Sequence, residues 1–197
     1  MRNEAGRQTL YWPSMAILKV ALLGDPVLRR KAAAVSRAVL RSTVFRRLVA
    51  DMTATMKEYD GVGLAAPQVR ESLRVVVIGA AANPRYPDAP QFPFRVLVNP
   101  RVTALRGPRI EWWEGCLSLP GLRGLVRRPG RVRVAYTDMK GRRRSMVADG
   151  FSAIVVQHET NHLDGKLYVD CLHDTRKLSY EREYGRYHAP AEKGKAD

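Results

Sequence analysis

The amino-acid sequence predicts a single α+β domain, in which small antiparallel or mixed β-sheets pack around a C-terminal helix and follow an N-terminal amphipathic helix. Three observations support this class. Apolar residues recur at helical spacing near residue 50, valine-rich segments bounded by glycine or proline follow, and helical periodicity returns after residue 150. A length of 197 residues fits one domain of this kind.

The first helix is expected over residues 41–59, where apolar side chains are spaced by three and four. These side chains are Val44, Phe45, Leu48, Val49, Met52 and Met56. A glycine-rich turn follows at residues 60–63. Strands are expected over residues 73–78 and 94–98, and the prolines at 84, 87, 90 and 93 indicate a surface loop between them.

The second half of the chain predicts a hairpin and then a helix. Val132, Val134 and Tyr136 alternate with Arg131, Arg133 and Ala135, which indicates a half-exposed strand over residues 131–136. A turn over residues 138–141 leads into a strand over 142–147. Helical spacing then runs over residues 151–163, and Gly165 is expected to end the helix.

The chain is expected to divide into three regions. Residues 1–14 are interpreted as a disordered or mis-assigned extension, because Met15 opens a more ordinary start. Residues 15–175 form the folded domain, and residues 176–197 form a charged tail that begins as a helix.

The composition restricts the function. Lysine and arginine number 34 against 19 acidic residues, and the net charge of +15 points to a polyanionic partner such as RNA. No apolar run approaches the ~20 residues of a membrane span, so a transmembrane protein is excluded. Residues 1–14 lack the apolar core of a secretory signal, and two cysteines make no disulfide framework, so a reducing cytosol is expected.

The expected C-terminal helix contains HETNH over residues 158–162, which is an HExxH pattern. Residues four apart lie on one helix face, so both imidazoles can bind one metal ion while Glu159 reaches a water as a general base. The histidines continue the apolar stripe of Phe151, Ile154 and Val155, which predicts that they point inward. A chance HExxH is the alternative, and the helical context favours the metal site.

A catalytic site of this type needs a third protein ligand. Cys116 is a candidate, because the preceding Gly115 permits close approach of the backbone. A buried structural cysteine is an equally open interpretation of this position. Cys171 lies in no such setting and is interpreted as structural.

Three sequence blocks together closely resemble the peptide deformylase family. They are GVGLAAPQ over residues 61–68, EGCLS over 114–118 and QHETNHLDG over 157–165, and the resemblance covers about residues 18–169. Members of this family remove the N-formyl group from the formyl-methionine of nascent bacterial proteins and release formate. The resemblance therefore implies a cytoplasmic bacterial hydrolase whose partners are N-formylmethionyl nascent peptides and, near the exit tunnel, the ribosome.

The resemblance also implies a ligand set. Cys116, His158 and His162 would bind one divalent metal ion, which is Fe(II) in the cell and can be Zn(II), Ni(II) or Co(II) in isolated protein. Glu159 would be the general acid and base.

Further roles follow from the other two blocks. The Gln68 amide and the Leu117 backbone N–H would bind the developing oxyanion, whereas an ordinary surface amide is the alternative for Gln68. Gly63, Gly115 and Glu114 would lie beside the substrate backbone, although a simple helix stop also explains the first glycine run.

The methionine side chain of such a substrate needs an apolar pocket. The candidates are Val62, Trp112, Phe151, Ile154 and Val155, and plain core packing is their alternative role. Arg123, seven residues after Cys116, resembles an arginine that lies near the substrate in the family.

Asn161 departs from the family pattern, which commonly has aspartate at this position. The residue is three positions after His158 and off the ligand face, so an outer hydrogen bond can survive while a charge is lost. Changes of this kind cost about 10- to 100-fold in metal affinity or activity.

A basic run lies between residues 123 and 144, where nine cations face one acid, Asp138. The cations are Arg123, Arg127, Arg128, Arg131, Arg133, Lys140, Arg142, Arg143 and Arg144. A solvated hairpin and a docking surface for ribosomal RNA are both open interpretations. Monomer and dimer are both open as well.

Two other functions compete with the hydrolase. An HExxH metalloprotease is disfavoured, because EGCLS is present and no third ligand of the protease type follows the motif. A basic RNA-binding protein with a structural metal would need four protein ligands, and the sequence offers three good ones.

Overall fold

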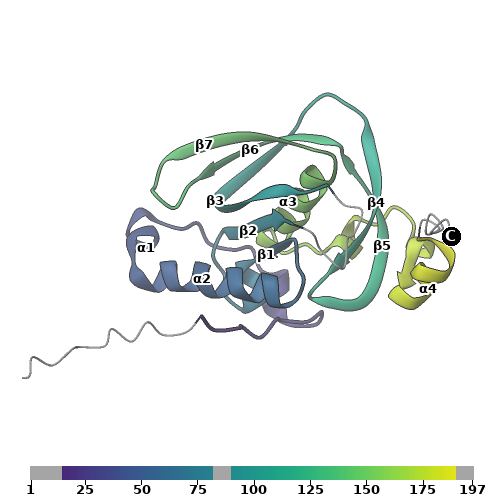
Figure 1. Cartoon of the computed structure of the whole chain (residues 1–197), viewed down its shortest axis with the longest axis horizontal. Coiled ribbons are helices and arrows are strands. Elements are labelled where there is room, and N and C mark those ends of the chain that lie inside the picture. The colour runs from purple at the N-terminus through teal and green to yellow at the C-terminus, as the bar shows by residue number, and fades with distance from the viewer. Residues whose placement is uncertain (1–14, 82–89, 190–197) are drawn as a thin grey trace, which may run out of the picture.

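Two antiparallel sheets enclose one helix in a computed structural model of the chain, which describes residues 15–81 and 90–189 (Figure 1). The first sheet has the order β1 (Gly63–Ala65), β2 (Val75–Ala80), β3 (Phe92–Ala104), β6 (Arg131–Thr137) and β7 (Arg143–Asp149). The second has the order β4 (Arg109–Cys116), β5 (Leu119–Pro129) and β8 (Leu178–Tyr180). The expected α+β class is therefore correct.

The helices are α1 (Arg37–Arg41), α2 (Thr43–Glu58), α3 (Gly150–Leu163) and α4 (Glu181–Tyr187) among the described residues. Short 3-10 turns occur at Pro26–Arg29, Ala66–Val69, Tyr168–Cys171 and Thr175–Lys177. None of the described helices has the length and apolar character that a membrane crossing requires.

The five-stranded sheet separates α2 from α3, and the residues of β2 show how. Successive side chains of a strand point to opposite faces. Val75 and Val77 pack with the apolar face of α2, whereas Val76 and Ile78 pack with α3. All four are buried, as expected for a strand covered on both faces. Strand β2 therefore reads as a nearly continuous apolar run.

Local sequence sets the ends of α2. Ser42 Oγ accepts a hydrogen bond from the Phe45 N–H (3.1 Å), which satisfies a free donor at the first turn. At the other end Asp60 has φ 49°, and the Gly61 N–H donates to the Met56 carbonyl (2.8 Å). The helix thus stops where the glycine-rich turn begins, and the chain turns directly into β1.

Helix α3 is buried on nearly all sides, which the predicted single apolar stripe understates. Phe151, Ile154, Val155, His158 and His162 are buried as expected, and so are Ala153, Val156, Glu159 and Leu163. The helix contacts strands of both sheets, so it has almost no solvent face (Figure 1). Its half-buried residues are the polar Ser152, Gln157, Thr160 and Asn161.

Several strand boundaries differ from the sequence prediction. The strand expected over 94–98 extends over Phe92–Ala104, because a register shift between Val98 and Arg101 carries it past Pro100, which has no N–H to donate. Strands β4 and β5 pair over most of their length, although their mixed charged and aromatic residues gave little alternation. The prolines at 84 and 87 lie outside the described residues.

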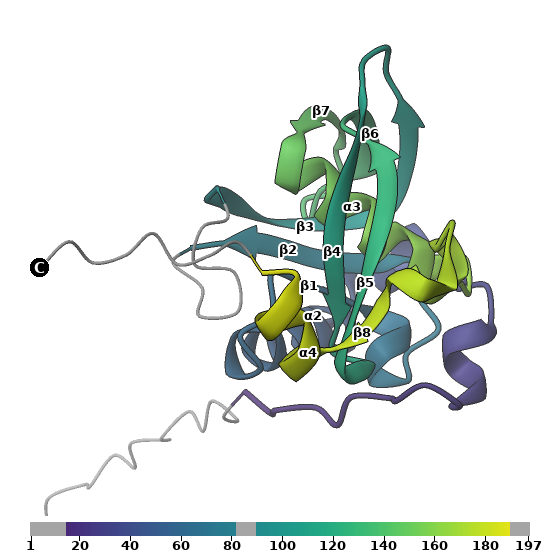
Figure 2. The ribbon, with the colours of Figure 1, turned by 90° about the vertical axis from the view of Figure 1, so that its right-hand side faces the viewer.

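The beginning of the C-terminal region is attached to the domain. Leu122–Gly124 of β5 pair with Leu178–Tyr180, so a 3-10 turn and the strand β8 come before α4 in this region (Figure 2). Trp113 on β4 packs against Tyr184 and His188 of this segment. The extension expected over residues 1–14 and the last eight residues lie outside the described part of the chain.

Two arginines of the basic run lie in the interior, which corrects its interpretation as one exposed hairpin. Arg123 is 5% exposed and pairs with Glu181 (2.7 Å), and Arg128 is 6% exposed and pairs with Glu114. Both belong to β5, whereas the other seven cations are exposed on β5, β6, β7 and the turn between the last two. The surface charge is therefore smaller than the sequence count indicates.

Gly165 provides a test of how α3 is joined to the N-terminal segment. It has φ 70°, and a Cβ there would lie 2.6 Å from the carbonyl oxygen of Arg29. We predict that Gly165→Ala lowers the free energy of unfolding by about 1–3 kcal/mol, because both strain and clash oppose the side chain. Urea denaturation would measure this change.

Gly185→Ala is the matched control, because a Cβ at that position of α4 meets nothing within 4 Å. It should leave stability unchanged or raise it slightly. Equal stability of the two variants would show that the Gly165 contact does not constrain the fold.

Candidate metal centre

Three potential metal ligands meet between the two sheets. Cys116 ends β4, whereas His158 and His162 lie one turn apart on α3. One ligand atom of each residue lies within 4.8 Å of the others, and Cys116 Sγ is 3.3 Å from His162 Nε2. Donors bound to one tetrahedral zinc-type ion are roughly 3.3–3.8 Å apart. The buried trio therefore fits a single metal ion, with a thiol and two imidazoles as donors.

Glu114 fixes the orientation of the first histidine. Its Oε2 lies 2.8 Å from His158 Nδ1, which leaves the Nε2 of His158 for the ligand cluster. Arg128 donates to both carboxylate oxygens of Glu114, in a pair that is almost completely buried. Burial raises the pKa of Glu114, but the hydrogen bonds from His158 and Arg128 lower it overall. The carboxylate therefore stays charged.

The two histidines have opposite electrostatic environments. Burial lowers the pKa of His158, but hydrogen bonds with Cys116 and Glu114 raise it well above its ordinary value. Burial, together with the charges of His158 and Arg128, lowers the pKa of His162 well below its ordinary value. The metal-free cluster thus favours one positive charge beside Cys116 and Glu114. A bound cation would supply that charge and leave both imidazoles neutral.

Asn161 forms an outer hydrogen bond of the kind that the sequence suggested. Its Oδ1 accepts from Arg128 Nη1 (2.6 Å) on the side of the guanidinium away from Glu114. The bond survives without the carboxylate that is common at this position. Tyr168 stacks on His158 with the ring centres 6.1 Å apart, so the imidazole is enclosed on one face.

Glu159 lies beside the ligands without being one of them. It is 5% exposed, and its Oε2 has no hydrogen-bond partner among the described residues. Burial raises the pKa of Glu159 to about 7, and the Glu114 charge adds to this while His158 and Arg128 oppose it. A Cβ at Gly63 would lie 2.5 Å from Glu159 Oε1, so only glycine lets β1 pass this carboxylate.

Gln68 is buried beside Cys116, so the alternative interpretation of this residue as an ordinary surface amide is wrong. Its Oε1 accepts from the Ala65 N–H (2.8 Å), so Nε2 is turned toward Cys116 Sγ (3.5 Å) and Ser118 Oγ (3.3 Å). Gln68 and Leu117 both line a small hollow that Cys116, His158 and Glu159 also line. Sequence reasoning missed Ser118, whose side chain fixes the amide and whose N–H points to Cys116 Sγ (3.4 Å). Its place in the EGCLS block was the available signal.

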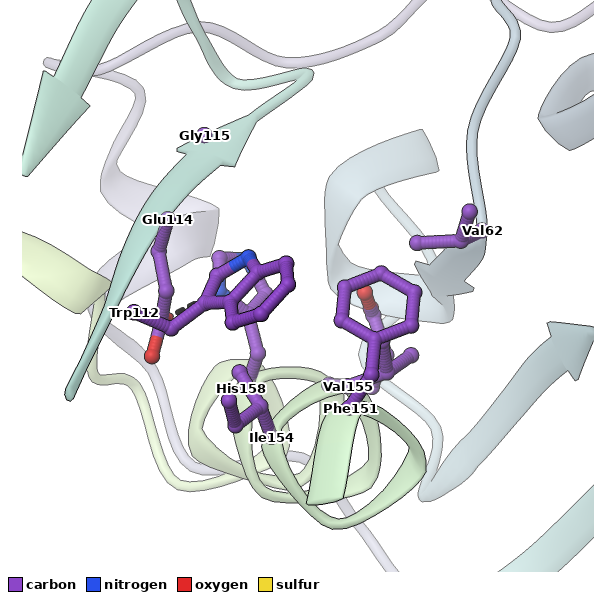
Figure 3. A pocket seen from close by; sticks show the side chains of 9 residues that line it. Val62, Trp112, Glu114, Gly115, Phe151, Ile154, Val155 and His158 are labelled. Carbon is purple, nitrogen blue, oxygen red and sulfur yellow. Dashed lines mark hydrogen bonds and ion pairs between the residues drawn. The ribbon is translucent and has the colours of Figure 1, made fainter. Parts of the chain in front are cut away.

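The five apolar candidates line one pocket next to the ligands (Figure 3). Trp112 from β4 and Val62 from the turn before β1 approach from opposite sides, and α3 supplies Phe151, Ile154 and Val155. Trp112 and Phe151 are in ring contact, with centres 5.1 Å apart. Glu114, Gly115, His158 and Glu159 complete the wall. The pocket thus leads from apolar side chains directly to the ligand cluster.

Arg123 is not part of this lining. A Cβ at Gly115 would lie 3.3 Å from the Arg123 guanidinium, so the arginine packs against the glycine. Its other partners are Glu181 (2.7 Å) and the Tyr184 ring, 5.7 Å from the guanidinium carbon. The structure therefore places it between β4 and the C-terminal segment.

The arrangement is suited to hydrolysis. Three ligands leave a fourth position of a tetrahedral ion open, which distinguishes catalytic from structural sites. A buried carboxylate that can hold a proton near neutral pH, an amide donor and a neighbouring apolar pocket surround that position. These parts suit the addition of water to a carbonyl group whose substituent occupies the pocket.

Comparisons with known proteins agree with this geometry. The family model described as polypeptide deformylase matches residues 17–178. A peptide deformylase of Leptospira biflexa is 42% identical over 170 residues, covering 86% of this chain and 95% of the relative. Peptide deformylase 2 of Bordetella bronchiseptica is 47% identical over 165 residues, covering 84% and 91%. A solved class I type b deformylase of Acinetobacter baumannii, bound to Met-Ala-Ser, is 42% identical with a TM-score of 0.78, covering 81% of this chain and all of that one.

The donor set can be tested by cobalt binding. We predict that one Co(II) binds per chain and gives a thiolate-to-cobalt charge-transfer band in the near ultraviolet. Cys116→Ser should remove the band, whereas the matched control Cys171→Ser should keep it. A band that disappears with Cys171 and persists without Cys116 would contradict the assignment.

Proposed function

This chain belongs to the polypeptide deformylase family, and we propose that Cys116, His158 and His162 hold its catalytic metal ion. The enzyme removes the N-formyl group from nascent peptides. One observation carries the residue assignment: the three donors, the carboxylate of Glu159 and the apolar pocket meet at one buried place. We propose Fe(II) as the ion in the cell, with Zn(II), Ni(II) or Co(II) as functional replacements.

When bound, the ion would supply a Lewis acid and lower the pKa of a water toward neutrality. Glu159 would take a proton from that water and return it to the leaving amine. Its burial supports this role, because a carboxyl group whose pKa is near 7 can both accept and donate. Gly63 keeps this carboxylate within reach of the peptide, since no side chain intervenes.

The formyl oxygen gains negative charge during the reaction and needs donors. We assign these to the Gln68 amide and the Leu117 backbone N–H, which line the same hollow as Cys116 and Glu159. Gln68 is held in place beforehand, because its Oε1 accepts from Ala65. A preorganised donor of this type is worth about 3 kcal/mol of barrier.

The substrate peptide would lie between Gly63 of β1 and Gly115 of β4. The apolar pocket would then take the methionine side chain, and the relative with bound Met-Ala-Ser supports a peptide of this type. Glu114 would form the wall between pocket and metal. Arg123 would support the Gly115 backbone by packing against it, rather than contact the substrate.

We further propose that residues 15–175 are the catalytic domain, that the enzyme works in the bacterial cytoplasm, and that it docks on the ribosome. Support for docking comes from the exposed cations of β6, β7 and the turn between them, on a chain of net charge +15. Two of these cations are partly neutralised, Arg131 by Asp149 (3.1 Å) and Arg144 by Asp138 (2.9 Å). Arg133, Lys140, Arg142 and Arg143 remain as the main candidates.

Replacing Glu159 tests the reaction directly. We predict that Fe(II)-loaded enzyme releases formate from formyl-Met-Ala-Ser, and that Glu159→Gln lowers kcat by about 100-fold or more, because the proton carrier is lost. Metal content and the unfolding midpoint of the variant should be measured alongside. A folded, metallated variant with normal turnover would exclude Glu159 as the base.

The apolar pocket has a control built into β4, because Trp112 and Trp113 point to opposite faces. We predict that Trp112→Ala raises KM for formyl-Met-Ala-Ser by about 10-fold through lost apolar contact. Trp113→Ala also removes an indole ring, but one that contacts Tyr184 instead of the pocket, and it should leave KM unchanged. Equal KM values for the two variants would place the substrate elsewhere.

Ribosome docking is tested by co-sedimentation at several salt concentrations. We predict that binding weakens steeply with salt, and that the double variant Arg142→Glu, Arg143→Glu binds more weakly than wild type. The double variant Lys57→Glu, Lys166→Glu changes the same charge at exposed positions elsewhere and is the control. Salt-independent binding, or equal loss in both variants, would contradict a docking surface on β6 and β7.

A further inference from the structure

A second and larger pocket lies on the polar face of α3, away from the metal ligands. It is lined by Gln157, Thr160 and Asn161 of the helix and by Pro100, Arg101 and Val102 of β3. Arg74, Arg128 and Asp164 complete the lining. The volume is about 400 Å³, against about 30 Å³ for each hollow at the metal centre. A volume of this order is typical of small-molecule sites.

The lining has a surplus of positive charge. Three arginines face one carboxylate, that of Asp164, which already pairs with Arg74 (2.7 Å). Arg101 forms no ion pair with any residue that the structure describes. Arg128 is compensated by Glu114, but that carboxylate lies at the metal centre and does not line this pocket. An anion placed here would therefore meet the guanidinium of Arg101, which has no ion pair among the described residues, beside two arginines that are already paired.

Neutral groups of the lining add hydrogen-bond donors rather than further negative charge. Asn161 Oδ1 is occupied by Arg128, so the orientation of its amide is fixed. Its Nδ2 has no partner among the described residues and is a donor to a ligand. A carboxylate at this position would instead oppose an anion. The surplus of arginine and the neutral amide thus favour the same class of ligand.

We propose that this pocket binds the phosphate group of a small molecule, through Arg101, Arg128 and the Asn161 amide. The Arg101 guanidinium matches the oxygens of phosphate and can form charge-assisted hydrogen bonds to them. Arg128 already donates to Glu114 and Asn161, so it contributes mainly its positive charge. Arg128 is 6% exposed, so a ligand can approach its charge only from within the pocket. This depth favours a small phosphomonoester over the continuous backbone of RNA. The site is separate from the formyl substrate, since the two sites face different sides of α3.

Calorimetric titration of zinc-loaded enzyme with inorganic phosphate and with glycerol phosphate tests the site. Wild type should show saturable binding of both. Arg101→Gln should raise Kd by about 10-fold, since one charge-assisted contact is lost. Asn161→Asp should weaken binding at least as much, because it replaces a donor by a negative charge while an oxygen remains for Arg128.

Arg143→Gln is the matched control, because it removes an exposed arginine outside the pocket lining. It should leave Kd unchanged, and phosphate held by zinc would be insensitive to all three variants. Absence of saturable binding, or equal Kd in wild type, Arg101→Gln and Asn161→Asp, would overturn the proposal. So would a single-stranded RNA that binds in competition with phosphate and loses affinity in the same two variants.

Discussion

The buried carboxylate of Glu114 is the interaction on which the centre depends. It lies between Arg128 and His158 and accepts hydrogen bonds from both in a place with almost no solvent. Removing it would leave a buried guanidinium unpaired, which costs several kcal/mol. Its contact with His158 Nδ1 also selects the ring nitrogen that faces the other ligands. One side chain of β4 thus stabilises the interior and orients a ligand of α3.

Burial of α3 explains why the site forms there. The helix packs between a five-stranded and a three-stranded sheet, and its apolar residues fill both contacts. Its polar residues must then find partners inside the protein. His158 meets Glu114, His162 meets Cys116, and the Glu159 carboxylate lies beside Gly63. A metal ion held by Cys116 and the two histidines would join β4 to α3, so metal binding and packing support the same arrangement.

Short-range sequence patterns predicted most of this centre, because the residues with chemical roles lie in short sequence motifs. HETNH lies on a helix, Cys116 lies in EGCLS, and the apolar candidates line one pocket. The interior role of Arg128 could not be predicted, since alternation along β5 does not say which of Arg127 and Arg128 faces inward. The extension of β3 past Pro100 could not be predicted for a related reason. The register shift between Val98 and Arg101 interrupts the alternation of inward and outward side chains. Both features depend on contacts between residues far apart in the sequence: β3 pairs with β6, and Arg128 pairs with Glu114.

The most direct test of the role of Glu114 is the zinc affinity of Glu114→Gln, measured by competition with a chelator. Glutamine keeps the size of the side chain and loses the charge that His158 and Arg128 share. We predict zinc binding weaker by about 10- to 100-fold in a folded variant, with Cys116 and both histidines still present. Wild-type affinity in the folded variant would contradict it, because the carboxylate would then have no part in holding the ligands.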